Sequence, residues 1–155
     1  MQKKEIILRI MYSVLFMAAV AALGTAFTDT SSNWYQSLII PALQPPGIVF
    51  TIVWTILYIL IASSLSIVSI NPKSAKKTLL LFASNGVLNV LWTYTFFYLQ
   101  KPASAVFVMI LIVITAAFLF AETYRVDKTA AYLLIPYLIW LCFAMYLNYE
   151  IAFLN

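Results

Sequence analysis

The fold is decided by residues 102–122, PASAVFVMILIVITAAFLFAE, which carry no charged side chain before the final glutamate. A bilayer core about 30 Å thick requires roughly 20 consecutive apolar residues in a helix. A run of this length and composition predicts a transmembrane helix.

The rest of the chain has the same character. Of its 155 residues, 65% are hydrophobic and only 9% are charged, whereas charged residues make up about a quarter of an ordinary soluble domain. Uninterrupted apolar runs predict helices at about 6–27, 47–70, 77–99, 102–122 and 129–154. We therefore expect an all-α integral membrane bundle of five transmembrane helices, forming one domain over residues 1–155.

The basic side chains indicate the orientation of this bundle. Of the nine Lys and Arg residues, only Lys101 falls on the side of the first and third loops. The other eight fall at the N-terminus and in the second and fourth loops: Lys3, Lys4, Arg9, Lys73, Lys76, Lys77, Arg125 and Lys128. Because cytoplasmic loops carry the excess of positive charge, we expect the N-terminus in the cytoplasm and the C-terminus outside.

The residues that are absent narrow the function. The chain has no histidine, the usual axial ligand of b-type haem, the commonest metal ligand and the commonest general base. The single cysteine, Cys142, is expected to be a buried, inert residue. Basic residues gather in loops and form no stripe that could follow a phosphate backbone. We expect no metal site, no required cofactor and no nucleic-acid partner.

The loop at residues 28–46 is longer than a simple connection requires. It holds Trp34 and Tyr35, an apolar stretch and three prolines, with Asp29 as its only charge. Long loops in compact domains are often functional, so one interpretation is a lid over a site. The alternative is an interfacial segment of the kind that aromatic belts provide.

Three of the predicted helices carry aromatic and polar side chains on one face. The spacing of three, four and seven residues that places side chains on one helical face is shared by three sets: Trp54 and Tyr58; Asn85, Asn89 and Trp92; Tyr137, Trp140, Ala144 and Asn148. If these faces converge, they enclose a cavity suited to a large planar apolar ligand with polar edges.

The asparagines also have a purely structural interpretation. Amide side chains commonly form hydrogen bonds between transmembrane helices. This interpretation is favoured for Asn85, and it is as plausible as ligand binding for Asn89 and Asn148. Pro136 is expected to kink the fifth helix.

Several motifs, in order along the chain, resemble the TspO/MBR family of membrane proteins, which includes the tryptophan-rich sensory proteins and the translocator protein. These motifs are Trp34-Tyr35 with Pro41; Pro45-Pro46 leading into Val53-Trp54-Thr55-Ile56-Leu57-Tyr58; Leu88-Asn89-Val90-Leu91-Trp92 with Phe96-Phe97; and Pro136-Tyr137-Leu138-Ile139-Trp140 with Leu147-Asn148-Tyr149. The resemblance covers nearly the whole chain.

This resemblance implies a five-helix bundle, often a homodimer, in a bacterial cell membrane. Its pocket would open under the first loop and receive porphyrins, sterols or isoquinoline and benzodiazepine-type drugs. The carried-over pocket residues are Trp34, Tyr35, Trp54, Tyr58, Asn89, Trp92, Trp140, Ala144 and Asn148, and the stripe on the fifth helix adds Tyr137. One departure concerns sterols, because Glu150 follows Tyr149 where animal members carry a basic residue.

The leading functional hypothesis is a membrane receptor or sensor that binds porphyrin. The resemblance also implies light- and oxygen-dependent porphyrin degradation, with porphyrin as ligand or substrate and Trp54 and Trp140 as the participating residues. Two alternatives stay open. The protein could be a translocator of porphyrin or sterol-like amphipaths, or a structural subunit of a membrane complex.

Overall fold

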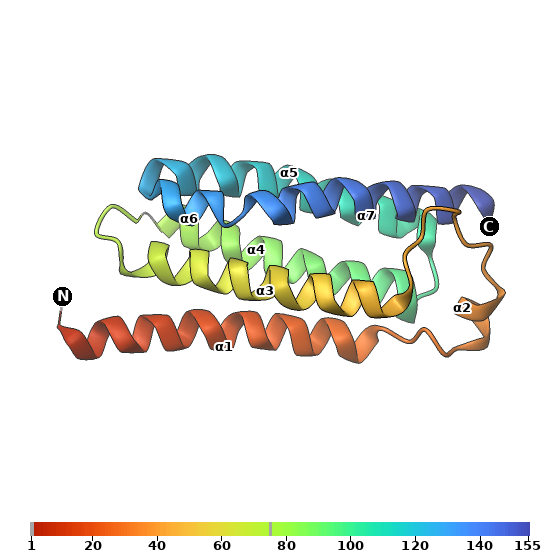
Figure 1. Ribbon diagram of the computed structural model, residues 1–155, viewed down its shortest axis with the longest axis horizontal. Coiled ribbons are helices and arrows are strands. Elements are labelled where there is room, and N and C mark those ends of the chain that lie inside the picture. The colour runs from red at the N-terminus through yellow and green to blue at the C-terminus, as the bar shows by residue number, and fades with distance from the viewer. Residues whose placement is uncertain (1, 75) are drawn as a thin grey trace.

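The computed structural model describes residues 2–74 and 76–155, and no strand occurs among them. Five helical segments are long and apolar enough to cross a membrane. They are formed by α1 (Lys3–Phe27), α3 (Gly47–Ile70), α4 (Lys76–Thr93) with the π-helical turn η1 (Tyr94–Tyr98), α5 (Pro102–Val126), and α6 (Lys128–Tyr132) with α7 (Ile135–Leu154). This confirms the all-α class and the five predicted spans (Figure 1).

All predicted span boundaries but one lie within three residues of the observed ones. The fourth span ends at Val126, one turn later than expected, because the helix continues past the apolar run, where Glu122 pairs with Lys77 and Arg125, each at 2.9 Å. The fifth span is interrupted between α6 and α7. Pro136 explains this break, because proline lacks an N–H and its ring clashes with the carbonyl four residues earlier.

The spans run alternately up and down the bundle. Helix α1 packs against α3 and α4, while α5 packs against α4 and α7. The connections after α3 and α5 lie at the same end as the N-terminus, so the eight basic residues lie toward one end as expected (Figure 1). Which end faces the cytoplasm stays a prediction.

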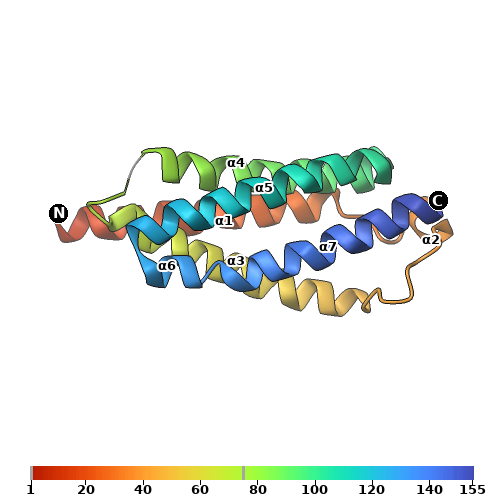
Figure 2. The same cartoon turned by 90° about the horizontal axis from the view of Figure 1, so that it is seen from above.

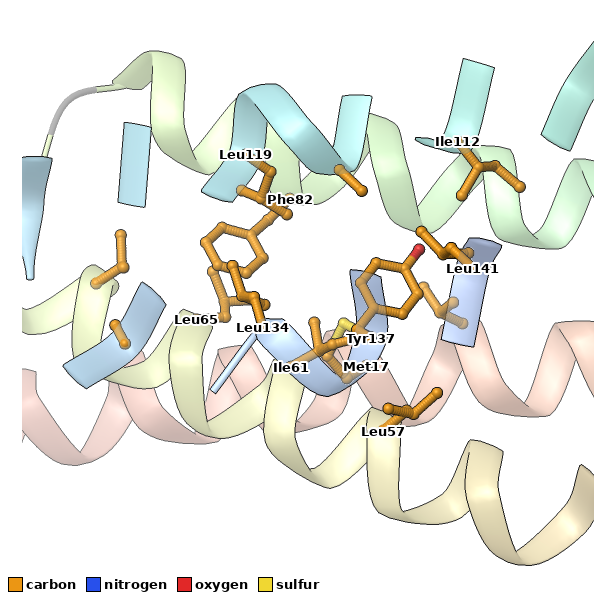
Figure 3. Packing of buried hydrophobic residues seen from close by; sticks show 14 of the residues in the cluster. Met17, Leu57, Ile61, Leu65, Phe82, Ile112, Leu119, Leu134, Tyr137 and Leu141 are labelled. Atoms are coloured by element: carbon orange, nitrogen blue, oxygen red, sulfur yellow. The ribbon is translucent and has the colours of Figure 1, made fainter. Parts of the chain in front are cut away.

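The closed half of the bundle is a packed apolar core. All five spans contribute buried side chains to this core, which contains Tyr137 (Figure 3). Tyr137 is only 1% exposed. Toward the end that carries the short helix α2 (Asn33–Ser37), α3 diverges from α7 (Figures 1 and 2). The residues that line a cavity lie in this half of the bundle, which is called the open half below, whereas the half with the packed core is the closed half.

The interior of the bundle is not the only place for apolar residues. Cys142 is exposed on α7, so the expectation that it is buried was wrong. A bilayer is as apolar as a protein core, and an outward-facing position in a span therefore needs no polar side chain.

Candidate ligand-binding site

A cavity of about 470 Å³ lies in the open half of the bundle. Its walls come from α1, α3, α4, η1 and α7, and the loop between α1 and α3 contributes Tyr35, Gln44 and Pro45. None of the described residues that line it is charged. Its volume falls within the range of about 300–1,000 Å³ that is typical of small-molecule sites.

Seven of the ten predicted ligand-binding residues line this cavity. They come from the loop, α3, α4 and α7, as the convergence of the three stripes requires: Tyr35, Trp54, Tyr58, Asn89, Trp92, Ala144 and Asn148. The structure thus brings together faces that are far apart in the sequence.

Three predicted residues lie outside the lining. Trp34 packs its ring against Phe96 at 5.8 Å between centroids, and Trp140 packs against Phe50 at 5.6 Å. Both Phe50 and Phe96 line the cavity, so these tryptophans stand behind it. Trp140 lies at the edge of the α7 stripe, about 40° from Ala144 at 100° per residue.

Tyr137 lies below the cavity for a different reason. It shares the helical face of Ala144 but precedes it by seven residues, which is about 10 Å along the axis. Its side chain is buried in the core. Spacing along a helix predicts the face of a residue, but it does not predict the depth at which a cavity ends.

A network of hydrogen bonds forms the floor of the cavity. The Tyr137 hydroxyl donates to Asn85 Oδ1 at 2.6 Å and accepts from Asn89 Nδ2 at 2.7 Å. Asn85 Nδ2 in turn donates to the Ile112 carbonyl on α5 at 3.1 Å. The interhelical role expected for Asn85 is confirmed, and Asn89 combines such a role with a place in the lining.

A second amide joins the far wall. Trp92 donates its indole N–H to Asn148 Oδ1 at 2.9 Å, and Asn148 Nδ2 donates to the Pro102 carbonyl at 3.0 Å. This places α4, α5 and α7 in one fixed arrangement. Asn148 is 2% exposed, so it too serves both as an interhelical link and as a lining residue.

The π-helical turn η1 adds two aromatic rings that were not among the predicted site residues. The Leu99 N–H donates to the Tyr94 carbonyl five residues earlier at 2.9 Å. This wider turn allows the consecutive residues Phe96 and Phe97 both to line the cavity. Such turns are frequent at functional sites, and no composition signal marks this one in the sequence.

Helix α1 approaches the cavity closely at Gly24. A Cβ built on Gly24 would lie 3.8 Å from the Tyr58 hydroxyl and 3.9 Å from Thr93. The other lining residues that the sequence analysis missed include Thr51 and Thr55 on α3. The small residues around Gly24, which include Ala21 and Ala22, are the signal that could have identified this close approach.

The loop over the cavity is held by hydrogen bonds within the loop and to Asn155 at the end of α7. Gln44 Nε2 donates to the Tyr35 hydroxyl at 3.0 Å, and Asn155 bonds to both backbone groups of Ile39 at 2.8 and 3.2 Å. Farther from the cavity, Ser31 donates two hydrogen bonds to the Asp29 carboxylate. These bonds hold the pKa of Asp29 below its usual value. The placement agrees with a lid, while opening and closing stay a hypothesis.

Five apolar spans around an uncharged aromatic cavity define an integral membrane protein with an internal site of ligand size. The chain belongs to the TspO/MBR family, which matches residues 13–154. It is 35% identical to the tryptophan-rich protein TspO of Chlorobaculum tepidum, over 88% of this chain and 89% of that protein.

Other relatives carry different names. The tryptophan-rich sensory protein of Cereibacter sphaeroides is 34% identical, over 91% of each chain. The translocator protein of Bos taurus is 32% identical, over 83% of this chain and 79% of that protein. The two bacterial relatives and the five apolar spans support the expected location in a bacterial membrane.

Proposed function

We propose that this protein is a membrane receptor that binds porphyrins and other planar apolar ligands in the cavity between α3, α4 and α7. The observation that carries the proposal is the wall of Trp54, Tyr58, Trp92, Phe96 and Phe97 around an uncharged volume of about 470 Å³. Aromatic rings supply a large contact area to flat ligands without demanding one hydrogen-bond pattern.

The polarity of the cavity suits an amphipathic ligand bound in one direction. A buried carboxylate without a partner is costly, and no described lining residue could neutralise one. The carboxylates of a porphyrin would therefore stay near the loop, where Thr28, Thr30 and Gln44 line the cavity. The apolar ring would lie deeper, against Trp54 and Trp92.

The packed core below the floor favours a receptor over a translocator. Tyr137 and Leu141 are 1% and 0% exposed and belong to the packed apolar core (Figure 3). A translocator would need a second conformation that opens this half. The translocator remains an alternative only because the Bos taurus relative carries that name.

Bound porphyrin also suggests a photochemical role. An indole can donate an electron to an excited porphyrin stacked on it. The reduced porphyrin then adds molecular oxygen to its ring, and the adduct returns the electron to the oxidised indole. Both oxygen atoms end on the opened ring, and the indole is regenerated. Of the two tryptophans expected to participate, Trp54 lines the cavity, whereas Trp140 lies behind Phe50. We therefore assign the donor role to Trp54.

To test binding, the detergent-purified protein is titrated with protoporphyrin in the dark. Tryptophan fluorescence is recorded at each addition. Saturable quenching is expected, with the dissociation constant raised about threefold to tenfold in Trp54→Phe. Trp34→Phe is the matched control, because Trp34 lies outside the lining, and it should leave the constant unchanged. Absence of saturable quenching in the unmodified protein would contradict the proposal and favour a structural subunit.

A further inference from the structure

One end of the bundle carries most of the charge. The N-terminus and the connections after α3 and α5 lie at this end (Figures 1 and 2). It holds eight of the nine basic side chains but only three of the five acidic ones. Its side chains therefore carry a net charge of +5, whereas one basic and two acidic side chains leave a net charge of −1 at the other end.

The three carboxylates at this end are held by groups of the protein. Glu122 pairs with Lys77 and Arg125, each at 2.9 Å. The Asp127 side chain accepts a backbone N–H of α6 at 2.9 Å, and Glu5 accepts a backbone N–H before the first turn of α1 at 3.2 Å. Within residues 2–74 and 76–155, only two of the eight basic side chains are therefore paired with a carboxylate.

Two other basic side chains make contacts of a different kind. Arg9 Nη1 donates to the Ser69 carbonyl near the end of α3, and Lys128 Nζ lies 5.6 Å from the ring centre of Tyr124. The remaining four, called the lysine patch below, are exposed and form no side-chain hydrogen bond or ion pair with the described residues: Lys3, Lys4, Lys73 and Lys76.

The lysine patch joins two segments that are far apart in the sequence. Ser69, which accepts the bond from Arg9, lies one residue before α3 ends at Ile70. Lys4 precedes Arg9 by five residues, which is about 8 Å along the helix axis. The first turn of α1 therefore passes the end of α3 and reaches the level of the connection that carries Lys73 (Figures 1 and 2).

The patch lies at the depth of the lipid headgroups. Helix α1 has no charged side chain in residues 10–27, and this stretch is about 27 Å long, close to the hydrocarbon core of about 30 Å. Lys3 and Lys4 lie beyond it, where the headgroup layer adds about 5–7 Å on each side. Phosphates are the anions of this layer, and the long lysine side chains reach toward it.

We propose that the lysine patch binds the phosphate groups of anionic phospholipids and collects lipids of the phosphatidylglycerol type at this end of the protein. Each basic residue near an anionic membrane surface contributes to such binding, and these four lysines give up no internal contact for it. The other end carries a net negative charge and should show no such preference. The patch is separate from the cavity and does not depend on the ligand bound there.

Electron paramagnetic resonance of spin-labelled lipids measures this preference in a bilayer. The full chain is reconstituted in phosphatidylcholine vesicles with a trace of phosphatidylglycerol or phosphatidylcholine, each labelled on the same acyl chain. Lipids next to the protein give a motionally restricted signal. We expect phosphatidylglycerol to associate about twofold to fivefold more strongly. NaCl at about 1 M should remove most of this difference, because the Debye length falls to about 3 Å.

Substitutions in the patch should remove the preference in steps. Lys73→Gln combined with Lys76→Gln should lower it, and the further changes Lys3→Gln and Lys4→Gln should abolish it. All four side chains are exposed, so the variants should fold, and circular dichroism checks their helix content.

A matched control lowers the net charge by the same amount as the first pair of substitutions. Lys101→Gln combined with Lys128→Gln alters one lysine at the other end of the bundle and one that contacts Tyr124. This variant should keep most of the preference for phosphatidylglycerol. An equal loss in this control and in the Lys73 and Lys76 variant would show that net charge acts without a defined patch, and it would overturn the inference.

Two further results would also overturn it. One is equal association of the two labelled lipids with the unmodified protein. The other is displacement of labelled phosphatidylglycerol by sodium phosphate more effectively than by NaCl of equal ionic strength, which would assign the patch to a soluble anion. Binding of protoporphyrin is measured separately, so none of these results bears on the proposed function.

Discussion

Trp92 and Asn148 meet across the cavity wall, with the indole N–H of Trp92 2.9 Å from Asn148 Oδ1. Asn148→Leu should lower the free energy of unfolding by about 1–3 kcal/mol, because it leaves a partly buried indole N–H without its acceptor. Thermal unfolding in detergent measures the effect. In combination with Trp92→Phe the two losses should be less than additive, and full additivity would show that the bond contributes nothing.

Tyr137→Phe should destabilise the protein by about 1–3 kcal/mol without enlarging the cavity, because it removes the hydroxyl that Asn85 and Asn89 share. Chemical denaturation in a mixed detergent measures this. Tyr132→Phe is the control, since Tyr132 is 54% exposed and should change stability little. Equal effects of the two substitutions would argue against the network.

Gly86→Leu should destabilise the packing of α1 against α4. A Cβ added at Gly86 would lie only 3.0 Å from the Phe16 ring and 3.1 Å from Val20. Overpacking of this kind typically costs about 1–3 kcal/mol. Gly47→Leu tests the same change at a position with nothing within 4 Å of the added Cβ. The thermal unfolding temperature should fall clearly only for Gly86→Leu.

The turn at Asp29 should respond to acid. Hydrogen bonds from Ser31 lower the pKa of Asp29, so the carboxylate stabilises this turn above its unfolded pKa of about 3.9. That stabilisation is lost as the pH falls through the lower folded pKa. The amide shifts of Ser31 and Ser32 in NMR spectra should titrate with a midpoint below that of a free aspartate, and Asp29→Asn should remove the titration.

Light-dependent loss of bound protoporphyrin should fall in Trp54→Phe and change little in Trp140→Phe. The reason is that Trp54 lines the cavity and Trp140 packs behind Phe50. Absorbance under illumination, with each variant saturated with porphyrin, measures the rate without the effect of affinity. Equal loss in both variants and in the unmodified protein would exclude Trp54 and Trp140 as electron donors.

Apolar length and helical spacing account for most of what could be predicted. The run of residues 102–122 needs no tertiary information to be identified as a span, and the spacing of Trp54 and Tyr58 fixes a shared face on α3 whatever surrounds it. The stripe from Asn85 to Trp92 likewise lies on the interior side of α4.

The rest depends on depth and backbone geometry, which the pattern does not encode. Tyr137 and Ala144 share a face, yet only Ala144 reaches the cavity. Cys142 lies in an apolar run but faces outward, because lipid and core accept the same residues. Phe97 joins the lining through a π-helical turn, which departs from the regular spacing that the sequence analysis assumes.

The π-helical turn at η1 has a consequence for the evolution of this span. It accommodates one extra residue between Tyr94 and Tyr98, so side chains before and after it follow two registers. Deleting a single residue there would return the turn to regular α-helical geometry, so that Phe96 and Phe97 would no longer both line the cavity. This end of the span should therefore accept exchanges of residues, whereas a deletion would remove an aromatic ring from the cavity wall.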